Sequence, residues 1–194
     1  MRLNQLRQIR KRYFGYDELA RVLGIAPASA RVAASRFVRQ GVLVRIKRNM
    51  YMLREVWQSA AREEVFAIAN LVQVPSYISL TTALDYYDIT TQIQRAYYES
   101  VATVRTKAVQ VDGTIFRYTR IAPGLYSGFR REKGVFIATP EKALVDAFYL
   151  MSLGRYALDL SALDGTRLDV KTIRDVSRDF PEKTRQLLRT HGYL

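Results

Sequence analysis

The spacing of apolar residues at the start of the chain is that of an amphipathic helix. Apolar side chains recur every three or four positions and so share one helical face; they are Leu3, Leu6, Ile9 and Tyr13. Gly15 is expected to end this helix. The basic residues of the segment fall outside the apolar stripe; they are Arg10, Lys11 and Arg12.

Two further helices are predicted, separated by a short turn. The first begins at Tyr16, turns Leu19, Val22 and Leu23 inward, and stops at Gly24. Pro27 opens the next, which runs to about residue 40. One face of this third helix is apolar and is expected to be buried: Ala30, Ala33, Ala34, Phe37 and Val38. The opposite face is largely polar and basic: Ser29, Arg31, Val32, Ser35, Arg36 and Arg39.

A β-hairpin is predicted after Gly41. Two short apolar runs, 42–46 and 50–53, flank the polar tip formed by Lys47, Arg48 and Asn49. Asn49 tolerates the positive φ that a tight hairpin turn requires. Three helices followed by such a hairpin predict a winged helix-turn-helix over residues 1–57.

The remainder, residues 58–194, is predicted to be a mixed α/β domain, so that the whole chain is α+β. Helices are expected at 59–72, from Ser79, from Pro140 to about 153, at 170–178 and at 181–190. Strands are expected at 97–105, 108–111, 114–121 and 134–138, with Asp112-Gly113 as a tight turn. The pattern leaves the order of the strands open.

The net charge of +13 is concentrated in the predicted winged helix. Residues 1–57 hold 13 Lys and Arg against three acids, a net charge of +10, whereas residues 58–194 hold 18 against 15. A localised excess of this size indicates a polyanionic partner, and a helix-turn-helix makes double-stranded DNA the expected one.

The third helix and the hairpin tip supply the expected DNA contacts. Arg31 can bond guanine in the major groove, with Ser29, Ser35 and Val32 against other base edges. Phosphate contacts are expected from the rest of the basic set: Arg36, Arg39, Lys47, Arg48, Arg10, Lys11 and Arg12, with Asn49 in the tip. A solvated basic face and a protein-interaction module are the alternatives.

No metal, cofactor or catalytic site is predicted. The chain has no Cys and one His, His191, which is too few for a typical zinc site. A nuclease active site would require Asp169 and Lys171 together with an upstream carboxylate, either Asp159 or Asp164. Asp169 is instead expected to cap a helix. A Ser/His triad would depend on His191. No segment has the length of a membrane span, so the protein is expected to be cytoplasmic.

Three segments of the second half carry a family resemblance. Residues 77–87 read YISLTTALDYY, residues 122–128 read APGLYSG, and residues 135–146 read VFIATPEKALVD. With the basic N-terminal motif, they resemble the AbiEi family, the antitoxins of abortive-infection AbiE type IV toxin–antitoxin systems. The resemblance implies a winged helix that binds inverted repeats and represses its own operon. It also implies a C-terminal domain that counters a nucleotidyltransferase-like toxin without a stable complex.

The segment from Thr139 to Asp146 is open to two interpretations. Thr139 as N-cap, Pro140 at the first position and Glu141 in the first turn make a strong helix start. The alternative is a functional site formed by Glu141, Lys142 and Asp146, although residues five apart share a helical face poorly.

Three functional hypotheses therefore follow from the sequence. The first is an antitoxin and autorepressor that places two copies on an inverted repeat. The second is a stand-alone winged-helix regulator whose C-terminal domain senses a ligand or partner. The third is a protein that chiefly neutralises a toxin, by interaction or modification, and binds DNA incidentally. Two monomers meeting on DNA are as compatible with the sequence as a preformed dimer.

Overall fold

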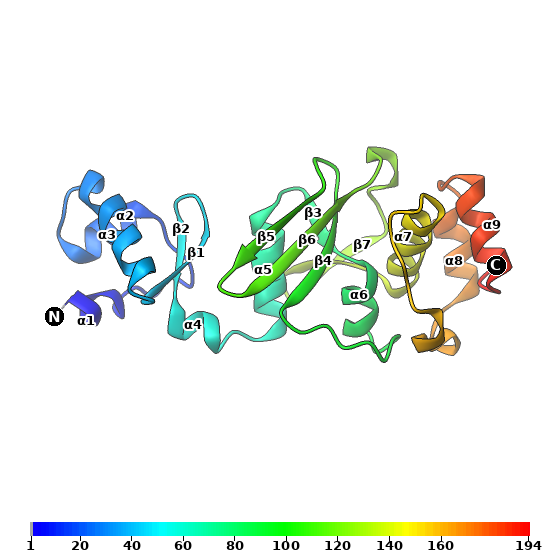
Figure 1. Ribbon diagram of the computed structural model, residues 1–194, viewed down its shortest axis with the longest axis horizontal. Coiled ribbons are helices and arrows are strands. Elements are labelled where there is room, and N and C mark those ends of the chain that lie inside the picture. The colour runs from blue at the N-terminus through cyan, green and yellow to red at the C-terminus, as the bar shows by residue number, and fades with distance from the viewer. Residues whose placement is uncertain (1) are drawn as a thin grey trace. The chain divides into compact units, whose positions relative to one another are not determined.

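The computed structural model describes residues 2–194, with side chains from residue 4 onward. The chain forms two compact units (Figure 1). The first runs to Val65 and includes the turn Val111–Gly113, and the second comprises Phe66–Gln110 and Thr114–Leu194. The sequence predicts a domain boundary between residues 57 and 58, and this boundary stays a prediction.

The first unit consists of helices followed by a hairpin. The helices are α1 (Arg2–Leu6), α2 (Tyr16–Leu23) and α3 (Pro27–Arg39), and α4 (Arg54–Gln58) comes after the hairpin. The hairpin pairs β1 (Leu43–Lys47) antiparallel with β2 (Met50–Leu53). Gly24 ends α2 in the left-handed region at φ 61°, as its position in the sequence predicts.

The core of the first unit confirms the predicted inner face of α3. Ala30, Ala33, Ala34 and Phe37 are buried, and Val38 is partly buried against them. The small alanine side chains let α3 pack closely against α2, from which Leu19 enters the same core.

The prediction of a first helix reaching Gly15 is wrong. Helix α1 ends at Leu6, and by Phe14 the chain is extended, exchanging two 2.9 Å backbone hydrogen bonds with Tyr51. A residue paired with a strand cannot also be helical, so tertiary pairing overrides the helical spacing. Leu6 and Ile9 are still buried, whereas Tyr13 is 42% exposed; the side chain of Leu3 lies outside the described residues.

The second unit is built on a six-stranded mixed sheet in the order β5-β6-β4-β3-β8-β7. Its strands are β3 (Ser76–Ile78), β4 (Tyr97–Ala102), β5 (Lys107–Val111), β6 (Thr114–Arg120), β7 (Phe129–Glu132) and β8 (Val135–Ala138). Strand β4 pairs parallel with β6 and antiparallel with β3, and β3 pairs parallel with β8. Strands β3 and β7 were not anticipated, because β3 is buried at every position and β7 reads FRRE, so neither shows an alternating pattern of apolar and polar residues.

Helices cover both faces of this sheet. On one face lies α5 (Arg62–Val72), where the Tyr118 hydroxyl donates to the Ala69 carbonyl at 2.7 Å. On the other lie α6 (Leu80–Tyr86) and α7 (Pro140–Ser152), which contact each other. The helices α8 (Val170–Ser177) and α9 (Glu182–Thr190) pack against α7 (Figure 1). Three short 3-10 helices complete the unit: η1 (Pro123–Leu125), η2 (Leu160–Ala162) and η3 (Gly165–Arg167).

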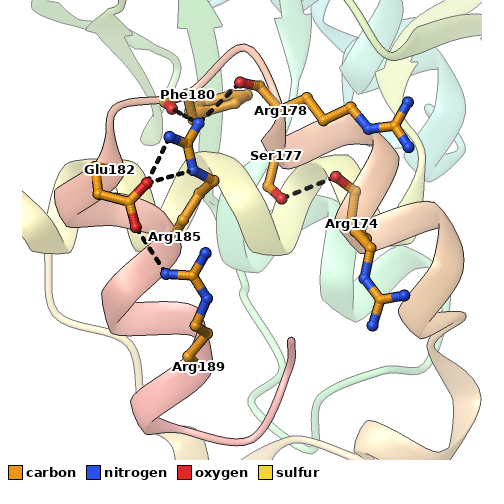
Figure 2. A network of polar contacts seen from close by, with 7 residues as sticks. All are labelled: Arg174, Ser177, Arg178, Phe180, Glu182, Arg185 and Arg189. Carbon is orange, nitrogen blue, oxygen red and sulfur yellow. Dashed lines mark hydrogen bonds and ion pairs between the residues drawn. The ribbon is translucent and has the colours of Figure 1, made fainter.

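A single arginine fixes the connection between α8 and α9. As Figure 2 shows, the Arg185 guanidinium donates to the carbonyls of Arg178 and Phe180, at 2.9 and 2.7 Å, and to the Glu182 carboxylate. Arg189 bonds the same carboxylate. The Lys142 ammonium lies over the ring of Phe180, 4.8 Å from the ring centre.

No helix within residues 2–194 combines the length and apolar character that crossing a bilayer requires.

Candidate nucleic-acid interface

The outer face of α3 is open to solvent along its whole length. Every residue predicted to lie on it is exposed, including Val32 at 69%; the set is Ser29, Arg31, Val32, Ser35, Arg36 and Arg39. The sequence folds this way because the alanine stripe on the other side is buried in the core.

Three arginines along this face form no ion pair with any residue from 2 to 194. Within residues 2–194, the guanidinium groups of Arg31 and Arg39 make no hydrogen bond or ion pair, and Arg36 lies 5.5 Å from the Phe37 ring centre. Ser35 instead donates its hydroxyl to the Arg31 carbonyl at 3.1 Å. This face therefore presents fixed positive charge together with one apolar side chain, Val32.

The hairpin turn carries the predicted basic tip. Arg48 is exposed and Lys47, at the end of β1, is partly exposed. Asn49 takes the predicted positive φ, at 55°. Arg45 is also exposed on β1, opposite Tyr51. Arg45 is not among the predicted DNA contacts, although a lone basic residue between apolar neighbours in a strand predicts an outward side chain.

Asn49 has a structural role that the sequence did not reveal. Its side-chain oxygen accepts a 2.7 Å hydrogen bond from the backbone N–H of Tyr16, the first residue of α2. The N-cap residue of α2 is Gly15, which has no side chain to do this. A Cβ on Gly15 would lie 2.9 Å from that same oxygen, so the glycine makes room for the Asn49 cap.

Electrostatics link the α3 face and the hairpin at Tyr51. Burial raises the pKa of Tyr51 to about 12, helped by its hydrogen bond to the Tyr16 hydroxyl. The charges of Arg45 and Arg31 oppose this shift. Both arginines therefore act on one hydroxyl, which places basic groups of α3 and of β1 in the same neighbourhood.

The basic run after α1 is partly engaged within the unit. Arg10, Lys11 and Arg12 are all exposed, but Lys11 bonds Glu18 at 3.4 Å and Arg12 forms an ion pair with Glu64. Arg10 makes no hydrogen bond or ion pair through its side chain with any residue from 2 to 194.

The segment 139–146 forms a helix start and a buried ion pair. Thr139 accepts from the Lys142 backbone N–H at 3.3 Å, which confirms it as the N-cap of α7, with Pro140 first. Lys142 and Asp146 are both fully buried and pair with each other. Asp146 also accepts from the hydroxyls of Tyr77 and Ser79, at 2.9 and 2.8 Å.

Two expectations for this region change in the structure. Ser79, expected to cap α6, occupies the N-cap position but donates its hydroxyl to Asp146 instead. Glu141 does not join the buried pair; its carboxylate accepts from the Asp169 backbone N–H at 3.4 Å. Burial of Lys142 and Asp146 is tolerated because each charge has a partner, which offsets the cost of removing it from water.

The carboxylates considered for a nuclease are engaged as local caps. Asp169 accepts from the N–H groups of Lys171 and Thr172, which confirms it as the N-cap of α8. Asp159 and Asp164 cap η2 and η3 in the same way. These hydrogen bonds lower the pKa of each of the three carboxyl groups. Among the described residues no three His, Asp or Glu side chains are grouped as a metal site.

Comparison with known proteins relates the first unit to a family. Residues 1–54 match the model of the family described as "Transcriptional regulator, AbiEi antitoxin", which confirms the resemblance at the N-terminus. A comparison with curated protein sequences gives no match. Among solved structures, the RV2827C protein from Mycobacterium tuberculosis is similar in fold, with a TM-score of 0.60 and 13% identity. The alignment covers 98% of this chain and 75% of that one.

Proposed function

We propose that the protein is a DNA-binding antitoxin and autorepressor whose first unit is a winged helix-turn-helix. In this proposal α2 and α3 form the helix-turn-helix, α3 enters the major groove, and the β1–β2 hairpin is the wing. The observation that carries it is the exposed face of α3, with Arg31 and Arg39 unpaired among residues 2–194. The AbiEi match over residues 1–54 supports the regulatory role.

The distribution of side chains argues for readout by α3 and anchoring by the hairpin. Arg31 lies in the first half of α3, with Val32 beside it, so this end is suited to base edges. Arg36 and Arg39 lie toward the other end, and Lys47 and Arg48 at the hairpin tip, where phosphates are the natural partners. Two copies on an inverted repeat would double both sets of interactions.

The same proposal assigns toxin control to the part of the chain that follows the proposed winged helix. Residues 58–194 are proposed to counter a nucleotidyltransferase-like toxin encoded nearby, without a stable complex. A repressor of its own operon acts in the cytoplasm, which is the proposed location. No catalytic role is assigned to this chain in the proposal.

DNA binding is tested with the full-length protein and a fluorescent duplex from the region upstream of its gene. Anisotropy should give tighter binding to this duplex than to a scrambled one, and affinity should fall steeply with salt. Arg31→Ala/Arg39→Ala should weaken binding at least about tenfold, because each charge-assisted hydrogen bond is worth ~1.5 kcal/mol or more. Arg174→Ala, which removes an exposed arginine of α8, is the matched control. Equal binding of the double variant and the wild type would refute the proposed interface.

Toxin control is tested separately with the same full-length variants. When the nucleotidyltransferase-like protein encoded beside the gene is expressed with the Arg31→Ala/Arg39→Ala variant, growth should be rescued as by the wild type. Failure of the wild-type protein to rescue growth would remove the antitoxin role while leaving the DNA-binding role standing.

A further inference from the structure

A cavity in the second unit combines positive charge with a buried carboxylate. It has a volume of about 510 Å³ and lies where β4 and β6 run parallel. Glu99 of β4 and Arg117 of β6 are direct partners in the register, so their side chains share a face of the sheet. The opposite face holds Phe116 and Tyr118, which are buried.

Glu99 is held in place by donors rather than by a salt bridge. It is 5% exposed, and its Oε2 accepts from the Tyr156 hydroxyl at 2.9 Å and from Gln94 Nε2 at 3.1 Å. Tyr156 is in turn fixed by a 2.7 Å hydrogen bond with the Thr81 hydroxyl. Both side-chain donors use Oε2, and a backbone hydrogen bond from Thr81 also acts on this carboxylate.

Two arginines line the cavity with their guanidinium groups unbonded. Neither Arg117 nor Arg155 forms a side-chain hydrogen bond or ion pair with another residue of the described chain, 2–194, and both are exposed. Arg117 lies close enough for its charge to act on Glu99, yet the two form no ion pair.

An aromatic and two hydroxyl side chains complete the wall. Tyr97 precedes Glu99 on the same face of β4 and is 36% exposed, so part of its ring faces solvent. Thr106 and Thr119 also line the cavity. Exposed aromatic rings beside guanidinium groups are suited to a flat, anionic ligand.

We infer that this cavity binds a mononucleotide. Arg117 and Arg155 would hold the phosphate, because guanidinium groups bond phosphate oxygens in pairs. Glu99 would accept an N–H of the base, since an ionised carboxylate is an acceptor only. The Tyr97 ring would lie against the base, and the volume falls within the range of small-molecule pockets. The inference does not depend on DNA binding by the first unit.

Calorimetric titration of the full-length protein tests this inference. The probes are GMP, AMP, CMP and UMP, with guanosine and inorganic phosphate as partial ligands. At least one mononucleotide should bind, and guanosine and phosphate should each bind at least about tenfold more weakly, because each lacks one set of interactions. No mononucleotide binding at millimolar concentration, or phosphate binding as tightly as every nucleotide, would overturn the inference.

Variants assign the binding to this cavity. Arg155→Ala and Arg117→Ala should each raise the Kd at least about tenfold, because each removes a charge-assisted hydrogen bond. Arg174→Ala, outside the cavity, should leave the Kd unchanged. Circular dichroism and Tm show whether each variant is folded, and Arg155, an exposed residue after α7, can be replaced without disturbing a strand. Unchanged nucleotide affinity in a folded Arg155→Ala/Arg117→Ala variant would place the ligand elsewhere.

Binding to the upstream duplex is measured on the same preparations. If the protein binds the duplex but no nucleotide, only this inference fails. If it binds a nucleotide through the two arginines but no duplex, the proposed DNA-binding function fails and the cavity assignment stands.

Discussion

The side-chain oxygen of Asn49, in the hairpin turn, accepts a 2.7 Å hydrogen bond from the backbone N–H of Tyr16 at the start of α2. A helix that lacks a capping side chain of its own thus receives one from a residue 33 positions away. This bond ties the hairpin turn, which carries the basic tip, to the start of α2.

Removing this cap should destabilise the first unit. Asn49→Gly keeps the positive φ but loses the acceptor, so the free energy of unfolding should fall by ~1 kcal/mol. Asn49→Asp retains the acceptor and is the matched variant. Urea unfolding followed by circular dichroism measures both. Equal losses in the two variants would mean that the hydrogen bond contributes nothing.

Gly15 should be intolerant of a side chain for a steric reason. Its φ of −105° is accessible to alanine, but an added Cβ would meet Asn49 Oδ1 at 2.9 Å. Gly15→Ala should therefore cost ~1–3 kcal/mol in the wild-type background. In the Asn49→Gly background the cost should be smaller by at least ~0.5 kcal/mol, a coupling that a double-mutant cycle resolves. Additive costs would show that the two residues do not interfere.

The two parts of the proposed interface should respond differently to mutation. Arg31→Ala should reduce the preference for the upstream duplex over a scrambled one by ~1–3 kcal/mol. Lys47→Ala/Arg48→Ala should weaken binding to both duplexes alike and reduce the salt slope by about one for each phosphate that is no longer bound. Anisotropy titrations at several salt concentrations separate the two effects. A weakened preference in the hairpin variant alone would reverse the assigned roles.

Removing either charge of the buried pair Lys142–Asp146 should lower the free energy of unfolding, and the two losses should differ in size. Asp146→Asn leaves a fully buried ammonium without its counter-charge and should cost ~3–5 kcal/mol. Lys142→Met should cost less, because Asp146 keeps the Tyr77 and Ser79 donors. Guanidinium unfolding gives the order, with exposed Lys183→Met as the control. A larger loss in Lys142→Met than in Asp146→Asn would contradict this account.

The stability contribution of Glu99 should depend on pH in a defined direction. Burial raises the pKa of Glu99 above its ordinary value of 4.5, and the Tyr156 and Gln94 donors only partly offset this. Below 4.5 the carboxyl is protonated in both states, and as the pH rises above that value the unfolded chain loses its proton first. Between pH 4.5 and the higher pKa of Glu99 in the folded protein, the free energy of unfolding of the wild type should therefore fall relative to that of Glu99→Gln.

The comparison is made by measuring Tm of both proteins across this range. A Tm difference that stays constant, or that moves in favour of wild type as the pH rises, would show that the carboxylate is stabilised rather than penalised by its surroundings.

Local sequence signals were sufficient where the structure depends on local geometry. The alanine stripe of α3 predicted its buried face, and Asp112-Gly113 predicted a turn in which both residues take positive φ. Thr139 and Asp169 were identified as caps because an N-cap bonds N–H groups only two or three residues ahead. Exposure of the basic α3 face followed from the same periodicity.

Contacts between residues far apart in the sequence determined the structural features that local sequence signals did not predict. The apolar spacing up to Tyr13 predicted a helix, but Phe14 pairs with Tyr51 as an extended residue. Ser79 was expected to cap α6, but its hydroxyl donates to Asp146 instead. The cavity around Glu99 depends on the parallel pairing of β4 with β6, strands separated in the sequence by β5.

The sequence by itself determined most of the helices and strands, the concentration of positive charge in the first 57 residues and the resemblance to the AbiEi family. Only the tertiary structure decided that Asn49 caps α2, that Lys142 and Asp146 are buried together, and that Glu99 lies beside two unpaired arginines within the described chain. The reason is physical: periodicity and caps involve residues within a turn or two, whereas burial and strand order depend on interactions between distant segments.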